Sequence, residues 1–146
     1  MLVRTTLVAL NQANYTGNYS VLHGLGTPAL QAKHSPGQLS AAFANLRNQN
    51  VDMSPVLVLS PELTENPTIS PQSALRLVGF VPSRPLQINF AMIFLPLDNR
   101  WRIDGLSVST VQMVAQVQPP TAMPAVAKHG ADPARKPDEK NAAKPK

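Results

Sequence analysis

Three side chains near the N-terminus have the types and spacing of an acid–base group. Tyr15, Tyr19 and His23 recur every four residues, so one continuous helix would place them on a single face. A tyrosine hydroxyl and an imidazole that share a pocket could exchange a proton with a substrate. The alternative is packing, with the apolar rings buried and the polar tips at the rim. Both interpretations stay open, because Gly17 and Asn18 interrupt the helical pattern.

Other reactive chemistry is scarce in this chain. Cysteine is absent, which excludes disulfides, thiol catalysis and thiolate metal sites. Glycines and a proline separate His23 from His34, and no carboxylate lies at ligand spacing, so we predict no metal and no cofactor. Phosphate-binding loops, dinucleotide fingerprints and nucleophile elbows are also missing from the sequence. The basic residues of the first 116 positions are dispersed, which predicts no nucleic-acid surface.

Composition divides the chain into two parts. Of the 146 residues, 43% are hydrophobic, which is enough for one packed core, and the net charge is +5. Six of the 15 prolines and six of the 13 Lys and Arg residues lie beyond residue 117, where no aromatic residue occurs. We therefore predict a folded domain at 1–116 and a disordered tail, rich in Pro, Ala and Lys, at 117–146. Such a tail either solubilises the protein or forms a basic arm for acidic partners.

The sequence contains no apolar run long enough to span a bilayer, so we expect no membrane insertion. Met1 leads directly into an amphipathic pattern, without the features of a signal peptide. Taken literally, this start predicts a cytoplasmic protein, whereas a true start farther upstream would be compatible with export.

The first 50 residues have the periodicity of helices. Apolar residues follow a helical stripe over 2–13, and a short second helix is expected from Asn18 or Ser20 to Leu25. Ser35 followed by Pro36 is typical of a helix start, because Ser caps the first turn and Pro suits its first position. This helix is expected to end at about 48–50. The sequence thus predicts two or three N-terminal helices.

After Asp52 the apolar period changes from 3.6 to 2, which indicates strands. Strand candidates lie at 56–59, 74–81, 86–97 and 100–110, and 62–73 is expected to be a loop. Asp98-Asn99 is typical of a two-residue hairpin turn. The fold class predicted is α+β, with the helices packed on a curved four-stranded antiparallel sheet.

The expected turns set which residues pair and which face they share. A turn at Asp98-Asn99 places Phe94 opposite Ile103 and Met92 opposite Gly105. A turn at Ser83-Arg84 places Gly79 opposite Ile88. One face then carries large apolar residues that we expect the helices to cover and that would line a pocket: Leu77, Phe90, Met92, Phe94, Trp101 and Ile103.

The opposite face is also too apolar for a sheet surface in water. A contiguous apolar patch on a soluble protein usually marks an interface, so the sequence predicts a homodimer formed through this face. Arg102 and Asp104 alternate there and are expected to form a surface or interface ion pair. A one-residue slip in register would exchange the two faces. The predicted interface residues are Phe80, Ile93, Leu95, Arg102, Asp104 and Leu106.

The order of helices followed by an antiparallel meander resembles the nuclear transport factor 2-like (cystatin-like) α+β cone. The segments 2–20, 75–80, 88–90 and 100–108 are similar to an uncharacterised bacterial family of that superfamily. The resemblance covers residues 2–112 and implies helices packed on a curved sheet. The fold hosts isomerases, dehydratases, transport adaptors and assembly domains, and similar bacterial chains often carry an export signal upstream.

The favoured function is a non-catalytic binding or assembly module that dimerises through its sheet. Its cone is expected either to be filled by its own side chains or to hold a small apolar ligand. The alternative is a small enzyme of the isomerase or dehydratase type that uses Tyr15, Tyr19 and His23. A third hypothesis is an adaptor whose basic tail binds acidic partners. The predicted pocket face contains no titratable residue, which favours binding over catalysis.

Overall fold

The computed structural model describes residues 1–113, and it has the α+β architecture that the sequence predicts. The predicted tail, 117–146, lies outside the described residues. The helices are α1 (Leu2–Thr16), α2 (Ser20–Gly24), α3 (Pro28–Lys33), α4 (Pro36–Ala42) and α5 (Ala44–Asn48). The strands are β1 (Glu62–Leu63), β2 (Thr68–Ile69), β3 (Leu75–Val81), β4 (Leu86–Leu97) and β5 (Arg100–Gln112).

The prediction of two or three N-terminal helices is wrong, because residues 2–48 form five helices. Gly17 ends α1 in the left-handed conformation, with φ 77°. Thr27 caps α3, and Pro28 is its first residue, so α3 begins with the same signal as the helix predicted at Ser35-Pro36. That predicted helix is divided at Phe43, where the backbone leaves the helical conformation, into α4 and α5.

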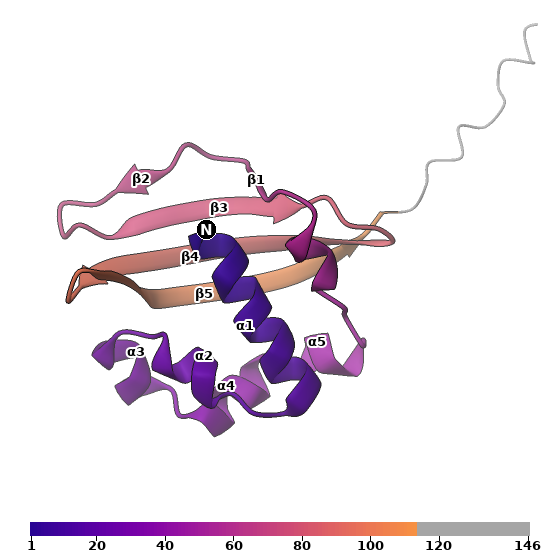
Figure 1. Cartoon of the computed structure of the whole chain (residues 1–146), viewed down its shortest axis with the longest axis horizontal. Coiled ribbons are helices and arrows are strands. Elements are labelled where there is room, and N and C mark those ends of the chain that lie inside the picture. The colour runs from indigo at the N-terminus through magenta and orange to yellow at the C-terminus, as the bar shows by residue number, and fades with distance from the viewer. Residues whose placement is uncertain (114–146) are drawn as a thin grey trace, which may run out of the picture. The chain divides into compact units, whose positions relative to one another are not determined.

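Helix α1 supplies much of the core. It crosses one face of the sheet, while α2 to α5 gather beside β5 (Figure 1). Val3, Leu7 and Leu10 lie on its buried stripe, and they belong to the same cluster as Met92 and Phe94 of β4. The helices therefore cover the face of the sheet that the alternation of apolar residues predicts.

No strand forms at 56–59: residues 56 and 57 end a 3-10 helix, Ser54–Leu57, and a turn follows at 58–59. Pro55 lies in the first turn of this helix, where its missing N–H costs nothing. The Arg4 side chain of α1 donates hydrogen bonds to the carbonyl oxygens of Val56 (2.9 Å) and Leu59 (3.2 Å). Val56 is fully buried. The segment therefore packs against α1 and does not pair with the sheet.

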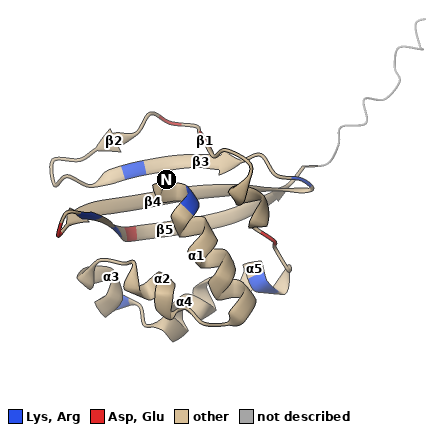
Figure 2. Cartoon of the chain, viewed as in Figure 1, with Lys and Arg blue, Asp and Glu red and all other residues tan. Residues whose placement is uncertain are grey.

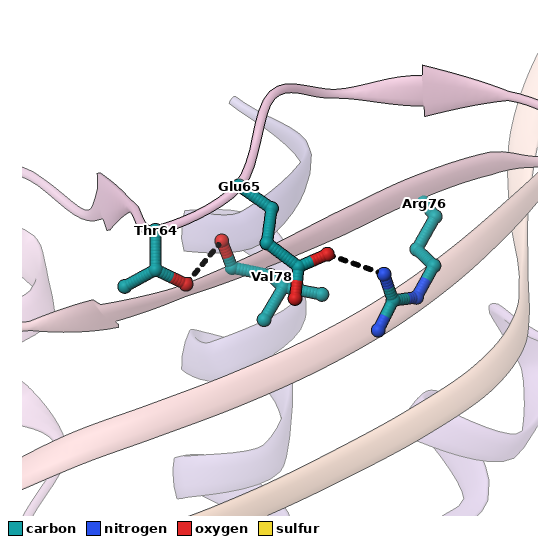
Figure 3. A network of polar contacts seen from close by, with 4 residues as sticks. All are labelled: Thr64, Glu65, Arg76 and Val78. Carbon is teal, nitrogen blue, oxygen red and sulfur yellow. Dashed lines mark hydrogen bonds and ion pairs between the residues drawn. The ribbon is translucent and has the colours of Figure 1, made fainter.

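Within residues 1–113 the sheet is antiparallel and has five strands rather than four, in the order β1-β3-β4-β5, with β2 also paired to β3. The predicted loop at 62–73 contains the two additional strands. Thr64 donates a hydrogen bond to the Val78 carbonyl oxygen, and Glu65 forms an ion pair with Arg76 (Figure 3). These contacts hold the irregular segment along the outer edge of β3.

Gly79 of β3 is where this segment approaches most closely. A Cβ atom at Gly79 would lie 2.0 Å from the Glu62 carbonyl oxygen and 2.8 Å from the Leu63 Cα atom. Any side chain would therefore collide with the β1 backbone. The pairing of β1 with β3 depends on this glycine.

The β4–β5 hairpin confirms the predicted turn, and then departs from the predicted register. Asp98 and Asn99 both have positive φ, and Phe94 pairs with Ile103 as expected. A β-bulge at Asp104 then places Ile93 opposite Gly105 and Met92 opposite Leu106. The prediction that Met92 faces Gly105 is wrong, because a bulge sets two residues of one strand against one residue of the other.

The register of β3 against β4 also differs from the prediction, but without exchanging the faces. Gly79 pairs with Phe90 rather than with Ile88, since the last pair between the two strands is Val81 with Ile88, which leaves six residues, 82–87, in the connection. The shift of two residues preserves the alternation of side chains. Val81, opposite Ile88, thereby joins the buried face.

Charged residues are few and scattered over the described domain (Figure 2). The only ion pair within residues 1–113 is Glu65–Arg76, at 2.5 Å. Exposed ion pairs of this kind contribute little to stability. The fold therefore depends mainly on its apolar core, and Asp104 of β5 has no cationic partner within the described domain.

Candidate binding site beside strand β5

An apolar cavity of about 300 Å³ lies between α2, α3, α4 and the middle of β5. We call it the β5 cavity. Pockets of this volume are at the lower end of those that hold small ligands. Its lining is mainly aliphatic and aromatic: Leu22, Leu30, Leu39, Ala42, Phe43, Ile103, Gly105 and Leu106, with His34 and Asp104 as the two titratable members.

Two capped helix starts position the helical walls of the β5 cavity. The Thr27 hydroxyl accepts a hydrogen bond from the Leu30 N–H (3.1 Å), which starts α3. Ser35 and Gln38 form a reciprocal capping box that starts α4. His34 lies between these two helices in an extended conformation. The short α3–α4 connection thus forms one rim of the cavity.

The β-bulge provides the polar group of the cavity. Asp104 is the additional residue in β5, and its half-buried carboxylate accepts a hydrogen bond from the Thr27 hydroxyl (2.8 Å). Bulges often re-aim a side chain beside a functional site. The result is a carboxylate at the edge of an apolar cavity, with a neutral hydrogen-bond donor as its protein partner.

The structure separates the three side chains that could have formed an acid–base group. Tyr15 is 90% exposed at the end of α1, whereas Tyr19 is only 2% exposed and precedes α2. The break at Gly17 prevents the single continuous helix that would align them. His23 is half-buried, and its Nε2 lies 3.2 Å from the Gln31 carbonyl oxygen.

Tyr19 has the contacts of a structural residue. Its hydroxyl donates to Asn14 Oδ1 and accepts a hydrogen bond from Arg47 Nη1 (2.6 Å). Its ring stacks in parallel on Phe43, with the ring centroids 6.5 Å apart, and the Arg47 guanidinium lies 5.5 Å from the Tyr19 ring centroid. These contacts join α1, α2 and α5 beneath the β5 cavity.

A second, more polar hollow of about 690 Å³ lies between α1 and the α5–3-10 segment, with Tyr15, Arg47 and Asp52 in its lining. Hydrogen bonds from the Ser54 side chain and then from its backbone N–H lower the pKa of the Asp52 carboxyl. The Asp52 carboxylate accepts a hydrogen bond from the Ser54 N–H (2.9 Å) and so stabilises a local turn before the 3-10 helix.

The residues predicted to line a pocket mostly fill the core. Phe90, Met92 and Phe94 are buried beneath the helices, and Leu77 packs against the same cluster. Trp101 is 40% exposed near the hairpin end. Of the six predicted residues, Ile103 lines the β5 cavity.

Of the residues predicted to form a dimer interface, Phe80, Ile93 and Leu95 lie on the face away from the helices. Leu106 does not, because the bulge turns it toward the helices and into the lining of the β5 cavity. Asp104 bonds Thr27, as described above, and Arg102 Nη1 donates to the Gly24 carbonyl oxygen (2.9 Å). Within residues 1–113 these two side chains do not pair with each other.

Of the ten residues that line the β5 cavity, the sequence placed only Ile103 in a pocket, and it assigned Asp104 and Leu106 to the dimer interface. A local signal for the α3 wall was present in Thr27-Pro28, which repeats the Ser35-Pro36 pattern. No comparable signal marked Asp104, since a bulge arises from pairing across strands.

Within residues 1–113, no group of three or more His, Cys, Asp or Glu side chains could hold a metal ion. The helices of this part are all too short or too polar to cross a bilayer. A scan of protein-family models found no match, and searches of curated proteins and of solved structures found no similar protein.

Proposed function

We propose that this chain is a non-catalytic binding module whose ligand places a small apolar group in the β5 cavity. The observation that carries this proposal is a preformed cavity of about 300 Å³ whose lining is mainly apolar, with His34 and the Asp104 carboxylate as its titratable groups. Apolar cavities with few polar groups bind ligands by burying apolar surface and use the polar group for orientation. The dispersed Tyr15, Tyr19 and His23 side chains favour binding over the isomerase or dehydratase alternative.

The proposal is tested by titrating benzene and 1-hexanol into ¹⁵N-labelled protein and following the amide signals. We expect saturable shifts at Leu39, Phe43 and Leu106. Ala42 and Ala41 are neighbouring exposed residues of α4, but only Ala42 lines the cavity. Ala42→Leu should therefore weaken binding at least about tenfold by occupying the cavity, while Ala41→Leu should leave it unchanged. Unsaturable shifts, or equal effects of the two variants, would contradict the proposal.

The module is also proposed to dimerise through the sheet face opposite the helices. Val78, Phe80 and Leu95 are half-buried there, and Ile93 is 37% exposed within the described domain. The apolar patch is smaller than the sequence predicts, because the bulge turns Leu106 and Val108 toward the helices and places Ser107 and Ser109 on this face. A two-fold axis would bury the same residues on both copies.

Sedimentation of the protein and of Ile93→Lys tests the dimer. The variant places like charges near the axis, so we expect folded monomers, while Thr5→Lys on the exposed side of α1 should remain dimeric. Monomeric unmodified protein at high micromolar concentration would refute the dimer.

The fold assignment to the nuclear transport factor 2-like superfamily belongs to the same proposal. It is supported by the order of the elements, with helices first and a long β3–β4–β5 antiparallel meander after them. It is also supported by α1 packing across the sheet (Figure 1). In such a fold, a cavity between helices and sheet is a natural ligand position.

A further inference from the structure

Strand β5 ends the sheet, and its outer edge is occupied only at one point within the described residues. There, the Ile103 N–H donates to the Leu25 carbonyl oxygen (3.0 Å), and the Thr27 N–H donates to the Ile103 carbonyl oxygen (2.8 Å). The segment 25–27 therefore runs along this edge as a short parallel strand would. It turns away at Pro28 into α3, and no backbone group of residues 1–113 takes its place farther along β5.

The pairing of β5 with β4 determines which backbone N–H and C=O groups of β5 point toward the open edge. The Met113 N–H donates to the Pro85 carbonyl oxygen (2.8 Å), on the side of β4. In an antiparallel pair, successive residues bond alternately inward and outward. Ser107 and Ser109 therefore bond to β4, whereas Leu106, Val108, Thr110 and Gln112 direct their N–H and C=O groups away from it.

Two hollows lie along this free edge. The β5 cavity is the first, and the second has a volume of about 350 Å³ between α4–α5 and residues 106–110. We call the second the edge hollow. The two share Ala42, Phe43 and Leu106 in their linings, so they adjoin. Together they form a groove that has an open strand edge on one side and helices on the other.

We propose that this groove binds an extended peptide segment of a partner protein, which adds to the sheet beside residues 106–112 and carries apolar side chains at alternate positions and a basic side chain two residues beyond them. Unpaired strand edges bind peptides through main-chain hydrogen bonds, while pockets read every second side chain. This inference rests on the proposed function, because one apolar side chain of the peptide is the group that fills the β5 cavity. The segment 25–27 shows that this edge already accepts an added strand.

The negative charge of Asp104 is the reason to expect a basic side chain in the bound peptide. Asp104 is half-buried at the end of the groove nearest Thr27, and it has no Lys, Arg or His nitrogen within 4.0 Å in the described domain. Among the described residues, its Oδ1 accepts a hydrogen bond from the neutral Thr27 hydroxyl. A Lys or Arg two residues from the apolar side chain would lie on the same face of an extended peptide and could meet this carboxylate.

The test uses a seven-residue synthetic peptide with capped ends. Valine, leucine and lysine occupy its second, fourth and sixth positions, and serine occupies the others. Its affinity is measured by calorimetry, and the protection of protein amides by hydrogen exchange. Residues 106, 108 and 110 should become protected on binding, whereas Ser107 and Ser109, already bonded to β4, serve as internal controls.

Variants of the peptide and the protein separate the contributions of main-chain hydrogen bonds, charge and side-chain packing to binding. N-methylation of the peptide amides that face β5 removes main-chain donors without changing charge, and it should abolish binding. Asp104→Asn keeps an acceptor for Thr27, so it should reduce affinity for the lysine peptide at least about tenfold and leave a peptide with glutamine there unaffected. Val108→Pro removes an outward N–H but no bond to β4, and Val108→Ala controls for lost packing.

The outcomes distinguish this inference from the proposed function. Saturable binding of benzene without binding of the peptide would overturn strand addition and leave the cavity proposal intact. Binding of the N-methylated peptide as tight as that of the unmodified peptide would also overturn strand addition and leave the cavity proposal intact. Unchanged hydrogen exchange at residues 106, 108 and 110 would have the same consequence. If those amides are already protected in the free protein in proportion to its concentration, a second copy occupies the edge and the inference fails. Absence of binding by both probes would overturn both.

Discussion

Thr27 and Asp104 join the start of α3 to the bulge of β5, through a 2.8 Å hydrogen bond between a hydroxyl and a carboxylate 77 residues apart in sequence. The same hydroxyl caps α3 by accepting the Leu30 N–H. The buried Thr27 hydroxyl oxygen therefore positions both α3, a helical wall of the β5 cavity, and the Asp104 carboxylate at the edge of that cavity.

Thr27→Val should destabilise the protein by about 2 kcal/mol, because it removes the cap and leaves the carboxylate without its donor. Thr27 is 1% exposed, so water does not replace the lost hydroxyl. Ser35→Ala removes a cap alone and should cost about 1 kcal/mol. Urea unfolding of both variants measures the difference. An equal loss in the two would show that the Thr27–Asp104 bond contributes nothing.

Gly79→Ala should detach β1 from β3, since its Cβ would lie 2.0 Å from the Glu62 carbonyl oxygen. We expect faster hydrogen exchange at Thr64, whose N–H donates to the Val78 carbonyl oxygen (2.9 Å), and a loss of stability. Gly105→Ala is the matched control in β5, where the nearest atom lies at an ordinary 3.5 Å. A Gly79→Ala variant as stable as Gly105→Ala would contradict the close approach of these strands.

Phe90→Ala should cost about 3–5 kcal/mol in unfolding free energy, because it leaves a cavity in a packed core. Phe90 belongs to the buried cluster beneath the helices. The control is Phe80→Ala, on the opposite face, where a half-buried ring loses fewer contacts. If the two variants were equally stable, the helix-facing side of the sheet would be a hollow pocket rather than core.

Asp52 should titrate below its ordinary value of 3.8, because the Ser54 side chain and then its backbone N–H lower the pKa of this carboxyl. The folded state holds the proton more weakly than the unfolded state. The resulting stabilisation is therefore present above pH 3.8 and is lost as pH falls through the folded pKa. Carboxyl ¹³C titration measures the midpoint, and Ser54→Ala should raise it. A midpoint at or above 3.8 in the unmodified protein would refute this prediction.

Local patterns predicted the features that depend on few neighbouring residues. Ser35-Pro36 marked a helix start because its hydroxyl and ring satisfy the first turn by themselves. Asp98-Asn99 marked the hairpin because both residues tolerate positive φ. The alternation of apolar residues in 86–97 likewise predicted the side of β4 that is buried.

The tertiary structure decided the features that depend on distant partners. The bulge at Asp104 transferred Leu106 from the predicted interface to the cavity, because the alternation of a strand reverses wherever one additional residue is accommodated by its neighbour. The segment 62–63 pairs with β3 because Gly79 lets its backbone approach, and 68–69 pairs with Leu75 and Arg76 at the start of the same strand. The sequence by itself thus determined the order and type of the main elements, whereas the β5 cavity arose from their packing, since its walls come from residues up to 84 positions apart in sequence.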